Sequence, residues 1–244
     1  MIDFHVHQPR GNAYAPAELV AGMDDVGVSK SVVFTYEGLL RPSPAANDSL
    51  AQFVGAAPER LCAFATVDPR DPGAAAEITR SVTSLGMRGI KLHPWLQGVS
   101  AHEPGLDAVC ETAAMHGIPV LFHDGTPPFS TPLQLASLAR RHPRTAIVLG
   151  HGGLHDLWRE AIAAVATTAN VHLCMCGTPG YAMRAIVRRC PPDRLLFGTD
   201  GGLRPEPMPR YAVLRIRQLD EIGLDDALRR AILDVNPRRL LEDT

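Results

Sequence analysis

Histidines and one aspartate stand at the ends of short apolar runs, and these residues could do chemistry. His5 and His7 end the first run with one residue between them, His123 and His151 end two later runs, and Asp200 ends another. Residues i and i+2 of a strand face the same side, so both histidines of the first run can reach one metal ion. Neutral imidazoles with a carboxylate suit Zn²⁺, and Mn²⁺ or Fe²⁺ less selectively. We therefore expect one divalent ion, with Zn²⁺ favoured.

Short β-rich apolar runs recur along the whole chain and must position these residues. Their starts lie 24 to 30 residues apart, and a strand, loop and helix together take about 30 residues. The eight runs are Ile2–His7, Ser31–Thr35, Leu61–Val67, Gly89–His93, Pro119–His123, Ala146–His151, Asn170–Cys176 and Leu195–Asp200.

The segments between the runs carry apolar residues at helical spacing. The expected helices are Ala15–Asp25, Ala74–Leu85, Leu106–His116, Pro132–His142, Leu157–Thr168, Ala182–Cys190, Pro209–Glu221 and Asp225–Leu241. This alternation predicts an α/β fold, a (β/α)8 TIM barrel, in which active sites lie at the C-terminal ends of the strands. An open doubly wound sheet is the alternative, but no G-x-G-x-x-G follows the first run.

Domain organisation follows from the same rhythm. No linker or low-complexity tract interrupts it, so we expect a single domain over residues 1–244. The longest irregular stretch, Tyr36–Asp48, contains Pro42 and Pro44 and is expected to be a loop over the barrel mouth. Because the other connections are short, we expect a shallow, open pocket for a small compound.

Composition excludes several classes of protein. With 244 residues, 45% hydrophobic and 20% charged residues and a formal net charge of −2, the chain is neither disordered nor typical of a nucleic-acid binder. No apolar run approaches the roughly 18 to 20 residues that span a bilayer. Five cysteines do not make a disulfide scaffold, and with no signal peptide they indicate reduced thiols in the cytoplasm. The expected partner is a small-molecule substrate, and a homo-oligomer is an open possibility.

Six segments along the chain carry a family resemblance: IDFHVH (2–7), GIKLHP (89–94), PVLFHDG (119–125), IVLGHGG (147–153), DRLLFGTDGG (193–202) and ILDVNPRRLL (232–241). In this order the sequence resembles the amidohydrolase superfamily, specifically the amidohydrolase-2 type of metal-dependent hydrolases and zinc-dependent decarboxylases. The resemblance implies that His5, His7, His123 and Asp200 are the metal ligands. It gives His151 the role of orienting the water or polarising the reacting group.

The residue types match the chemistry that this resemblance implies. A divalent ion lowers the pKa of a bound water from about 15.7 towards about 7. Asp200 could take the proton of that water and pass it to the leaving group, and His151 could stabilise the oxyanion that forms. The alternatives are a plain ligand or structural carboxylate for Asp200, and a histidine that is simply hydrogen-bonded above the sheet for His151.

Lys91 and His93 share a strand face and are candidate substrate-binding residues. In binuclear superfamily members a fourth-strand lysine is carbamylated and bridges two metals. Lys91 lies two residues inside the strand end, so we favour a mononuclear site in which it sets local charge or binds an anionic substrate group. A buried, paired structural lysine is the alternative.

Further candidates follow other expected strands. Arg10, Trp95, Tyr181 and Arg204 line the presumed mouth, and either arginine could hold a substrate carboxylate bidentately or be a solvated loop residue. The two cysteines of the seventh run, Cys174 and Cys176, are interpreted as small packing residues.

The sequence is compatible with two enzymatic reactions and, less well, with two other classes of protein. The first is hydrolysis of a small amide, lactam, lactone or ester-like substrate by metal-activated water, and an open site favours it because water has easy access. The second is metal-dependent decarboxylation of an aromatic or unsaturated carboxylic acid. A catalytically silent binding barrel is less favoured because every expected ligand type is present. A metal-dependent phosphoesterase or nuclease is less favoured because such enzymes usually use further carboxylates for two or three metals, whereas the fourth run offers Lys91 and His93.

Overall fold

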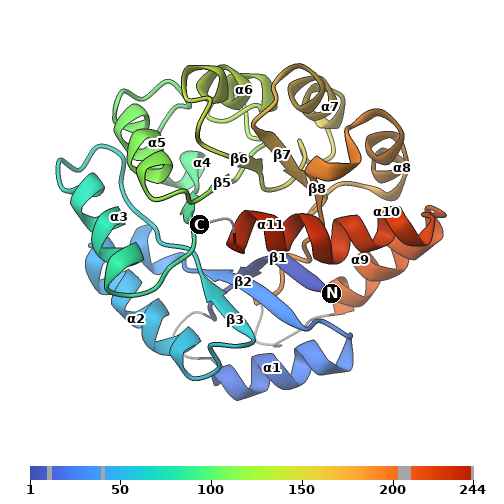
Figure 1. Cartoon of the computed structure of the whole chain (residues 1–244), viewed down its shortest axis with the longest axis horizontal. Coiled ribbons are helices and arrows are strands. Elements are labelled where there is room, and N and C mark those ends of the chain that lie inside the picture. The colour runs from blue at the N-terminus through green and yellow to red at the C-terminus, as the bar shows by residue number, and fades with distance from the viewer. Residues whose placement is uncertain (10–12, 40–41, 203–209, 243–244) are drawn as a thin grey trace.

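Strands and helices alternate around a central barrel in the computed structural model, which describes residues 1–9, 13–39, 42–202 and 210–242. Helices form an outer ring around the strands (Figure 1). The strands are β1 (Ile2–His7), β2 (Lys30–Phe34), β3 (Leu61–Ala63), β4 (Ile90–Leu92), β5 (Val120–Phe122), β6 (Ile147–Leu149), β7 (Val171–Cys174) and β8 (Leu195–Leu196). The helices are α1 (Pro16–Asp25), α2 (Ser43–Gly55), α3 (Ala74–Thr83), α4 (Pro94–Gln97), α5 (Gly105–Met115), α6 (Pro132–Arg141), α7 (Trp158–Thr167), α8 (Gly180–Arg189), α9 (Arg210–Glu221), α10 (Asp226–Arg230) and α11 (Asn236–Glu242).

Parallel pairing joins the strands in sequence order, as β1-β2-β3 and β4-β5-β6-β7-β8. Two isolated parallel bridges connect these sheets, Val6 with Gly201 and Ala65 with Ile90. A backbone hydrogen bond of 3.0 Å from Phe4 N to Phe197 O strengthens the first junction. The strands therefore close into the TIM barrel that the sequence predicts.

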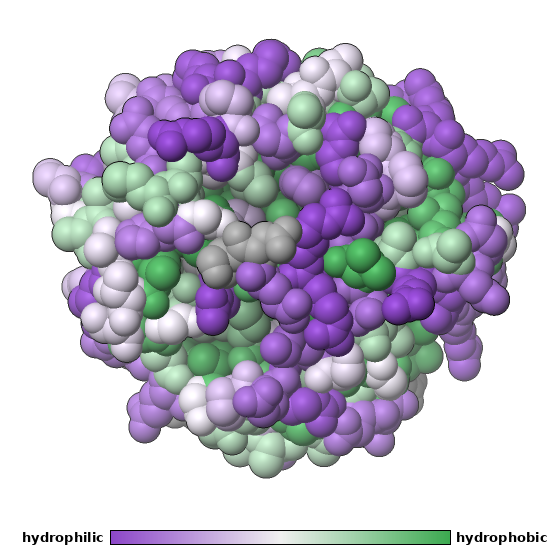
Figure 2. Space-filling model, in the orientation of Figure 1, coloured by the Kyte–Doolittle hydropathy of each residue, from purple (hydrophilic) through white to green (hydrophobic). Residues whose placement is uncertain are grey.

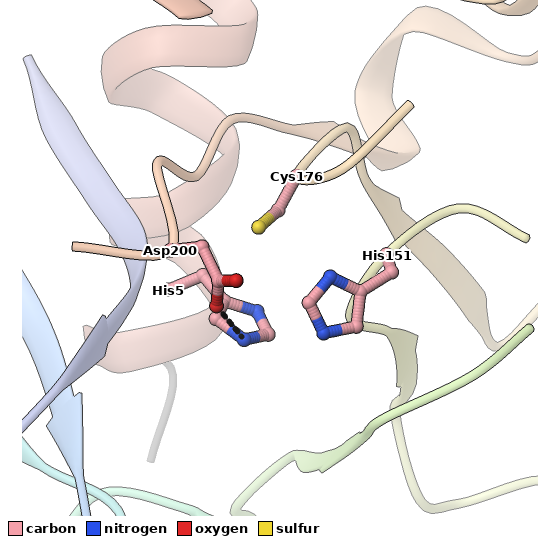
Figure 3. Close-up of side chains that lie close together, drawn as sticks. All are labelled: His5, His151, Cys176 and Asp200. Carbon is pink, nitrogen blue, oxygen red and sulfur yellow. Dashed lines mark ion pairs between the residues drawn. The ribbon is translucent and has the colours of Figure 1, made fainter. Parts of the chain in front are cut away.

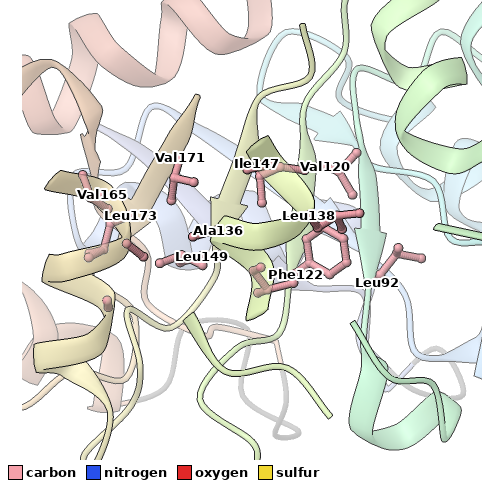
Figure 4. Packing of buried hydrophobic residues seen from close by; sticks show 14 of the residues in the cluster. Leu92, Val120, Phe122, Ala136, Leu138, Ile147, Leu149, Val165, Val171 and Leu173 are labelled. Carbon is pink, nitrogen blue, oxygen red and sulfur yellow. The ribbon is translucent and has the colours of Figure 1, made fainter. Parts of the chain in front are cut away.

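Two apolar layers hold the barrel. Inside it, the rings of Phe4 and Phe64 meet edge to face, with centroids 5.6 Å apart. Outside it, Val120, Phe122 and Leu138 are among the buried side chains between the strands and α5 to α8 (Figure 4). Both faces of the short strands are buried, which explains why the runs are almost continuously apolar.

A register irregularity in β1 decides which way its side chains point. Phe4 belongs to the cluster inside the barrel, whereas Val6, two residues later, packs between the sheet and α1. The pairing of β1 with β2 shifts between Asp3 and Val6. Such irregularities re-aim side chains near active sites, and this one leaves His5 and His7 facing Phe34 at the top of the interior.

The prediction of a loop over Tyr36–Asp48 is wrong for most of the residues that the structure describes there. A short 3-10 turn covers Glu37–Leu39, and α2 begins at Ser43. Pro44 lies in the first turn of that helix, where the missing N–H has no intrahelical role. Leu50 and Phe53 then pack into the cluster beside β1 to β3. The prolines therefore start a helix that packs against the barrel, and they do not form a long cover over its mouth.

The C-terminal helices close the opposite end of the barrel. Asn236 Nδ2 donates 2.8 Å hydrogen bonds to Leu195 O and Pro192 O, which places α11 at the start of β8. Figure 2 shows that hydrophilic side chains cover much of this face. In the described part of the chain, no helix has the length and apolar character needed to cross a membrane.

Candidate active site

The C-terminal strand ends bring most of the predicted site residues together. His5 is the centre of the group: its ring lies 4.5 Å from that of His151 and 5.5 Å from that of His7, measured between centroids. The buried members of the site are His5, His7, Lys91, His93 and His151. His123 and Asp200 are partly exposed at the same end of the barrel.

Asp200 lies between the two histidines of β1. Its Oδ1 is 3.1 Å from His7 Nε2 and 3.4 Å from His5 Nε2. Burial opposes ionisation of this carboxyl, but the hydrogen bond with His7 and the neighbouring charges lower its pKa to about 2. Asp200 also has a φ of +63°, a conformation that few non-glycine residues adopt. Strain of this kind gathers at functional sites.

A buried carboxylate fixes β1 against β8 below the site. Asp3 Oδ1 accepts from the backbone N–H groups of His5 and Thr199, each at 3.1 Å, and its other oxygen accepts from the Thr199 hydroxyl. Burial raises the pKa of Asp3 to about 7 despite these donors. At Gly198 a Cβ would lie 2.6 Å from that of His5, so only glycine allows the two strands this approach. Asp3 therefore positions His5 and Asp200 relative to each other.

A second buried carboxylate positions His151. Asp124 accepts hydrogen bonds of 2.6 Å from the backbone N–H groups of His151 and Gly153. Burial lowers the pKa of His151 to about 3 and raises that of Asp124 to about 6. The His151 imidazole is therefore neutral near pH 7, in a form that can donate a hydrogen bond or bind a metal.

His93 follows β4 and His123 follows β5, and their rings stack on each other with centroids 3.8 Å apart. Burial lowers the pKa of both rings, that of His93 to about 2. His93 also accepts a hydrogen bond from Leu96 N at 3.4 Å and so begins α4. The His123 ring lies 4.3 Å from that of His151, which places it beside the other imidazoles.

Lys91 is buried inside the barrel, with 4% of its surface exposed. Its Nζ has no hydrogen-bond partner among the described residues and lies 4.7 Å from the centroid of the Phe34 ring. Burial lowers the pKa of Lys91 to about 8. A small pocket with a free volume of about 10 Å³ reaches it, lined also by Tyr36 and His93. Within the part of the chain that the structure describes, the amine thus has no hydrogen-bond partner that would make it a structural lysine.

The remaining predicted mouth residues lie further out or outside the description. Trp95 and Tyr181 are 53% and 62% exposed. Trp95 remains in contact with the site through His93, at 6.1 Å between ring centroids, whereas Tyr181 contacts Trp158. Arg10 and Arg204 lie outside the described residues.

Four donor groups converge closely enough to hold a cation. Ligand atoms of His5, His151, Cys176 and Asp200 all lie within 4.8 Å of one another, and Figure 3 shows these side chains pointing toward a common centre. His5 Nδ1 is buried and has no hydrogen-bond partner among the described residues. Imidazole, thiol and carboxylate donors in this arrangement fit a divalent cation.

The sequence analysis missed two residues of this site. Cys176 was interpreted as a packing residue, and it does lie in the apolar cluster inside the barrel, but its sulfur also belongs to the four-residue donor group, which the sequence analysis did not predict. Tyr36 was placed correctly in a loop but was not named as a site residue; its ring stacks on that of His7 with centroids 4.3 Å apart, and its hydroxyl lies 3.4 Å from His7 Nε2. Its position directly after the second run was the available signal.

Comparison with known proteins gives one family and many similar folds. A family model described as Amidohydrolase matches residues 2–242. The structure of 5-carboxyvanillate decarboxylase from Sphingomonas paucimobilis superposes with a TM-score of 0.74 at 19% identity, over 99% of this chain and 98% of that one. For 2,6-dihydroxybenzoate decarboxylase from Rhizobium the TM-score is 0.71 at 18% identity, over 99% and 98%.

A third similar structure is a protein from Pseudomonas putida assigned as a 2-pyrone-4,6-dicarboxylic acid hydrolase. Its TM-score is 0.71 at 20% identity, over 98% of this chain and 96% of that one. No curated protein matches the chain. At these identities the structural similarity establishes the fold.

Proposed function

Because this chain belongs to the amidohydrolase family, we propose that it is a metal-dependent hydrolase of a small amide, lactam, lactone or ester-like compound. One observation carries the proposal. The Asp200 carboxylate is ionised beside His5 and His7, and 24% of its side chain remains exposed. The site therefore offers an anionic base at the position where water can reach the buried histidines.

The metal would be held by His5, His7, His123 and Asp200, of which His5 and Asp200 also belong to the donor group described above, whereas His7 and His123 do not. Zn²⁺ is favoured for imidazole and carboxylate ligands, with Mn²⁺ and Fe²⁺ as alternatives. When bound, a divalent ion supplies Lewis acidity to the substrate carbonyl and makes water a nucleophile near neutral pH. We place this activity in one barrel domain, residues 1–244, in the cytoplasm.

Proton transfer falls to Asp200 in this proposal. A carboxylate oxygen accepts the proton of the attacking water and then delivers it to the leaving nitrogen or oxygen. Its contact with His7 and the strained φ of +63° hold it in one orientation. Such orientation is needed because a general base must lie within hydrogen-bond distance of the proton it takes.

His151 and Lys91 would act on the substrate. The neutral His151 ring, fixed through Asp124, is placed to donate a hydrogen bond to the oxygen that gains charge in the transition state. Lys91 lines the pocket with Tyr36 and His93 and would bind an anionic group of the substrate. Trp95 and Tyr181, with Arg10 and Arg204, are proposed as outer substrate contacts.

Decarboxylation of an aromatic or unsaturated acid is the second candidate, and Lys91 is the observation that favours it. A buried amine with no hydrogen-bond partner among the described residues can hold the carboxylate that leaves as carbon dioxide. Two of the similar structures are decarboxylases of aromatic acids. The same site could then use Asp200 to move a proton at the reacting carbon.

Product analysis in ¹⁸O-labelled water separates the two reactions. Zinc-loaded protein is incubated with a panel of lactones, amides and esters and with aromatic and unsaturated acids, and Asp200→Asn serves as the control for contaminating activity. Incorporation of one ¹⁸O into a product carboxylate, without carbon dioxide, supports the hydrolase. Release of carbon dioxide without incorporation of ¹⁸O would overturn it in favour of the decarboxylase.

A further inference from the structure

We propose that Cys176 is a sulfur ligand of the divalent ion in this site, and that it makes the site select Zn²⁺ or Co²⁺ over Mn²⁺. The inference rests on the proposed metal dependence but concerns a residue outside the expected ligand set. It changes which ion the protein takes, because the expected ligands offer only nitrogen and oxygen atoms.

Geometry is the first support. The Cys176 sulfur, one nitrogen each of His5 and His151, and a carboxylate oxygen of Asp200 lie within 4.8 Å of one another. Ligand atoms of a tetrahedral zinc site, with bonds of about 2.0 to 2.3 Å, are roughly 3.3 to 3.8 Å apart. The four groups come from the ends of β1, β6, β7 and β8 and face one centre (Figure 3). Small side-chain movements would therefore bring the Cys176 sulfur to an ion held by His5 and Asp200, the two expected ligands that belong to this group.

The loop that carries Cys176 is fixed in place, which is the second support. The buried Arg215 guanidinium of α9 donates to the carbonyls of Met175 and Thr178. The Thr178 hydroxyl donates to Met175 O at 2.8 Å. At Gly177, whose φ is +77°, a Cβ would lie 3.2 Å from His151 Nδ1. The loop is thus held in place beside the His151 imidazole, next to the proposed ion.

An unsatisfied buried atom is the third and independent support. His5 is fully buried, and its Nδ1 has no hydrogen-bond partner among the described residues. Buried polar atoms are normally paired, and one without a partner points to a ligand. His5 belongs to the same four-residue group as Cys176, so a cation bound there would give the His5 imidazole a partner and would lie within reach of the Cys176 sulfur.

Cys174, the last residue of β7, provides the contrast. Like Cys176, it is fully buried and packs in the apolar cluster inside the barrel. It is not part of the four-residue donor group. The two cysteines share residue type, burial and strand face, so a substitution of Cys174 controls for loss of packing at Cys176.

The donor type gives the selectivity. Thiolates prefer zinc among the candidate ions, whereas sets of carboxylate and water suit Mn²⁺. Cobalt(II) takes the same tetrahedral set and reports on it, since sulfur-to-cobalt charge transfer absorbs in the near ultraviolet. A purely nitrogen and oxygen site lacks that band.

The test titrates the metal-free full-length chain with Co²⁺, comparing wild type, Cys176→Ser and Cys174→Ser. We expect the charge-transfer band in wild type and Cys174→Ser, and its loss in Cys176→Ser with the cobalt still bound. Competition between Zn²⁺ and Mn²⁺ should then show a zinc preference reduced on the order of 10- to 100-fold in Cys176→Ser, the size of effect known for groups that tune metal sites.

Each failure has its own meaning. Stoichiometric cobalt binding by wild type without the band would overturn the sulfur ligand and leave the metal-dependent function standing. Absence of cobalt binding in wild type would overturn both. Should Cys176→Ser not fold, X-ray absorption of the zinc-loaded wild type decides, because a sulfur neighbour at about 2.3 Å supports the inference and its absence refutes it.

Discussion

The two sides of the barrel mouth are built differently. On the side of β1 and β8, Asp3 and Asp200 make hydrogen bonds or close ion pairs with their neighbours, and Thr199 completes the connection between the strands. On the side of β4 and β5, His93 and His123 are held by ring stacking, and Lys91 has no ion pair among the described residues. We call the first the acidic side, because it carries the Asp200 carboxylate at the mouth, and the second the basic side, because it carries the buried Lys91 amine. Asp124 also follows β5, but its carboxylate is occupied by two backbone N–H groups.

From this difference we infer that the two sides of the mouth have different functions. An ionised carboxylate beside imidazoles attracts a cation and can accept a proton. Lys91, whose pKa burial lowers only to about 8, can carry the charge that attracts an anion on the other side, and a bound anion would offset the desolvation that opposes this charge. His151 lies between the two sides, in ring contact with both His5 and His123. We therefore propose that the first side binds the metal and transfers protons and that the second binds a charged group of the substrate.

The largest effect is expected when the metal ligands on the acidic side are removed by substitution. His5→Ala/His7→Ala should lower the metal content from about one ion per chain to near zero, because both imidazoles of the first strand are lost. Activity should vanish with it. Plasma emission analysis of the purified variant measures this, with the exposed His102→Ala as the control. Equal metal in the double variant and wild type would contradict the assignment.

The next largest loss of activity is expected for Asp200→Asn. An amide is a far weaker base than a carboxylate, so kcat is expected to fall by about 10²- to 10⁴-fold, the usual contribution of a positioned general base. The fold should persist, since the side chain is at the mouth and partly exposed. Single-turnover kinetics measure the effect, and Asp156→Asn, at an exposed carboxylate, is the control. Near wild-type turnover would rule out the role.

Lys91→Met tests the basic side. A charge-assisted hydrogen bond is worth about 1.5 to 3 kcal/mol, so KM for an anionic substrate should rise roughly 10- to 100-fold. In wild type KM should also rise above pH 8, because the amine, with its pKa lowered to about 8, is charged below that pH and neutral above it. The variant should lack this pH dependence. Lys30→Met, at the only other lysine of the chain, is the control. An unchanged KM would remove Lys91 from substrate binding.

The smallest effect concerns the link between the two sides. Asp124→Asn weakens two 2.6 Å hydrogen bonds to the backbone of His151 and Gly153. The free energy of unfolding should fall by about 1 to 3 kcal/mol. Asp68→Asn, which breaks an exposed ion pair with Arg70, should cost less than about 1 kcal/mol. Urea unfolding measures both, and equal losses would show that Asp124 contributes no more than a surface carboxylate.

Local pattern accounts for the parts that the sequence predicts well. Each predicted run contains its strand apart from one residue at the start of β2, since Lys30 precedes the run that begins at Ser31. Helices such as α3 and α6 begin at the predicted residues, Ala74 and Pro132. The missed helix α2 shows the limit. Prolines near its start indicate a loop when taken alone, and the apolar contacts that identify a helix lie in its later turns.

The sequence by itself determined the strand rhythm, the barrel and the strand ends that carry histidine, lysine and aspartate, because these depend on spacing within about 30 residues. Only the tertiary structure decided which of those ends meet. Cys176 reaches His5 because the barrel closes between β1 and β8, and the register shift in β1 turns both of its histidines inward. A change of one residue in register reverses the face of every side chain that follows, so strand spacing alone cannot specify these contacts.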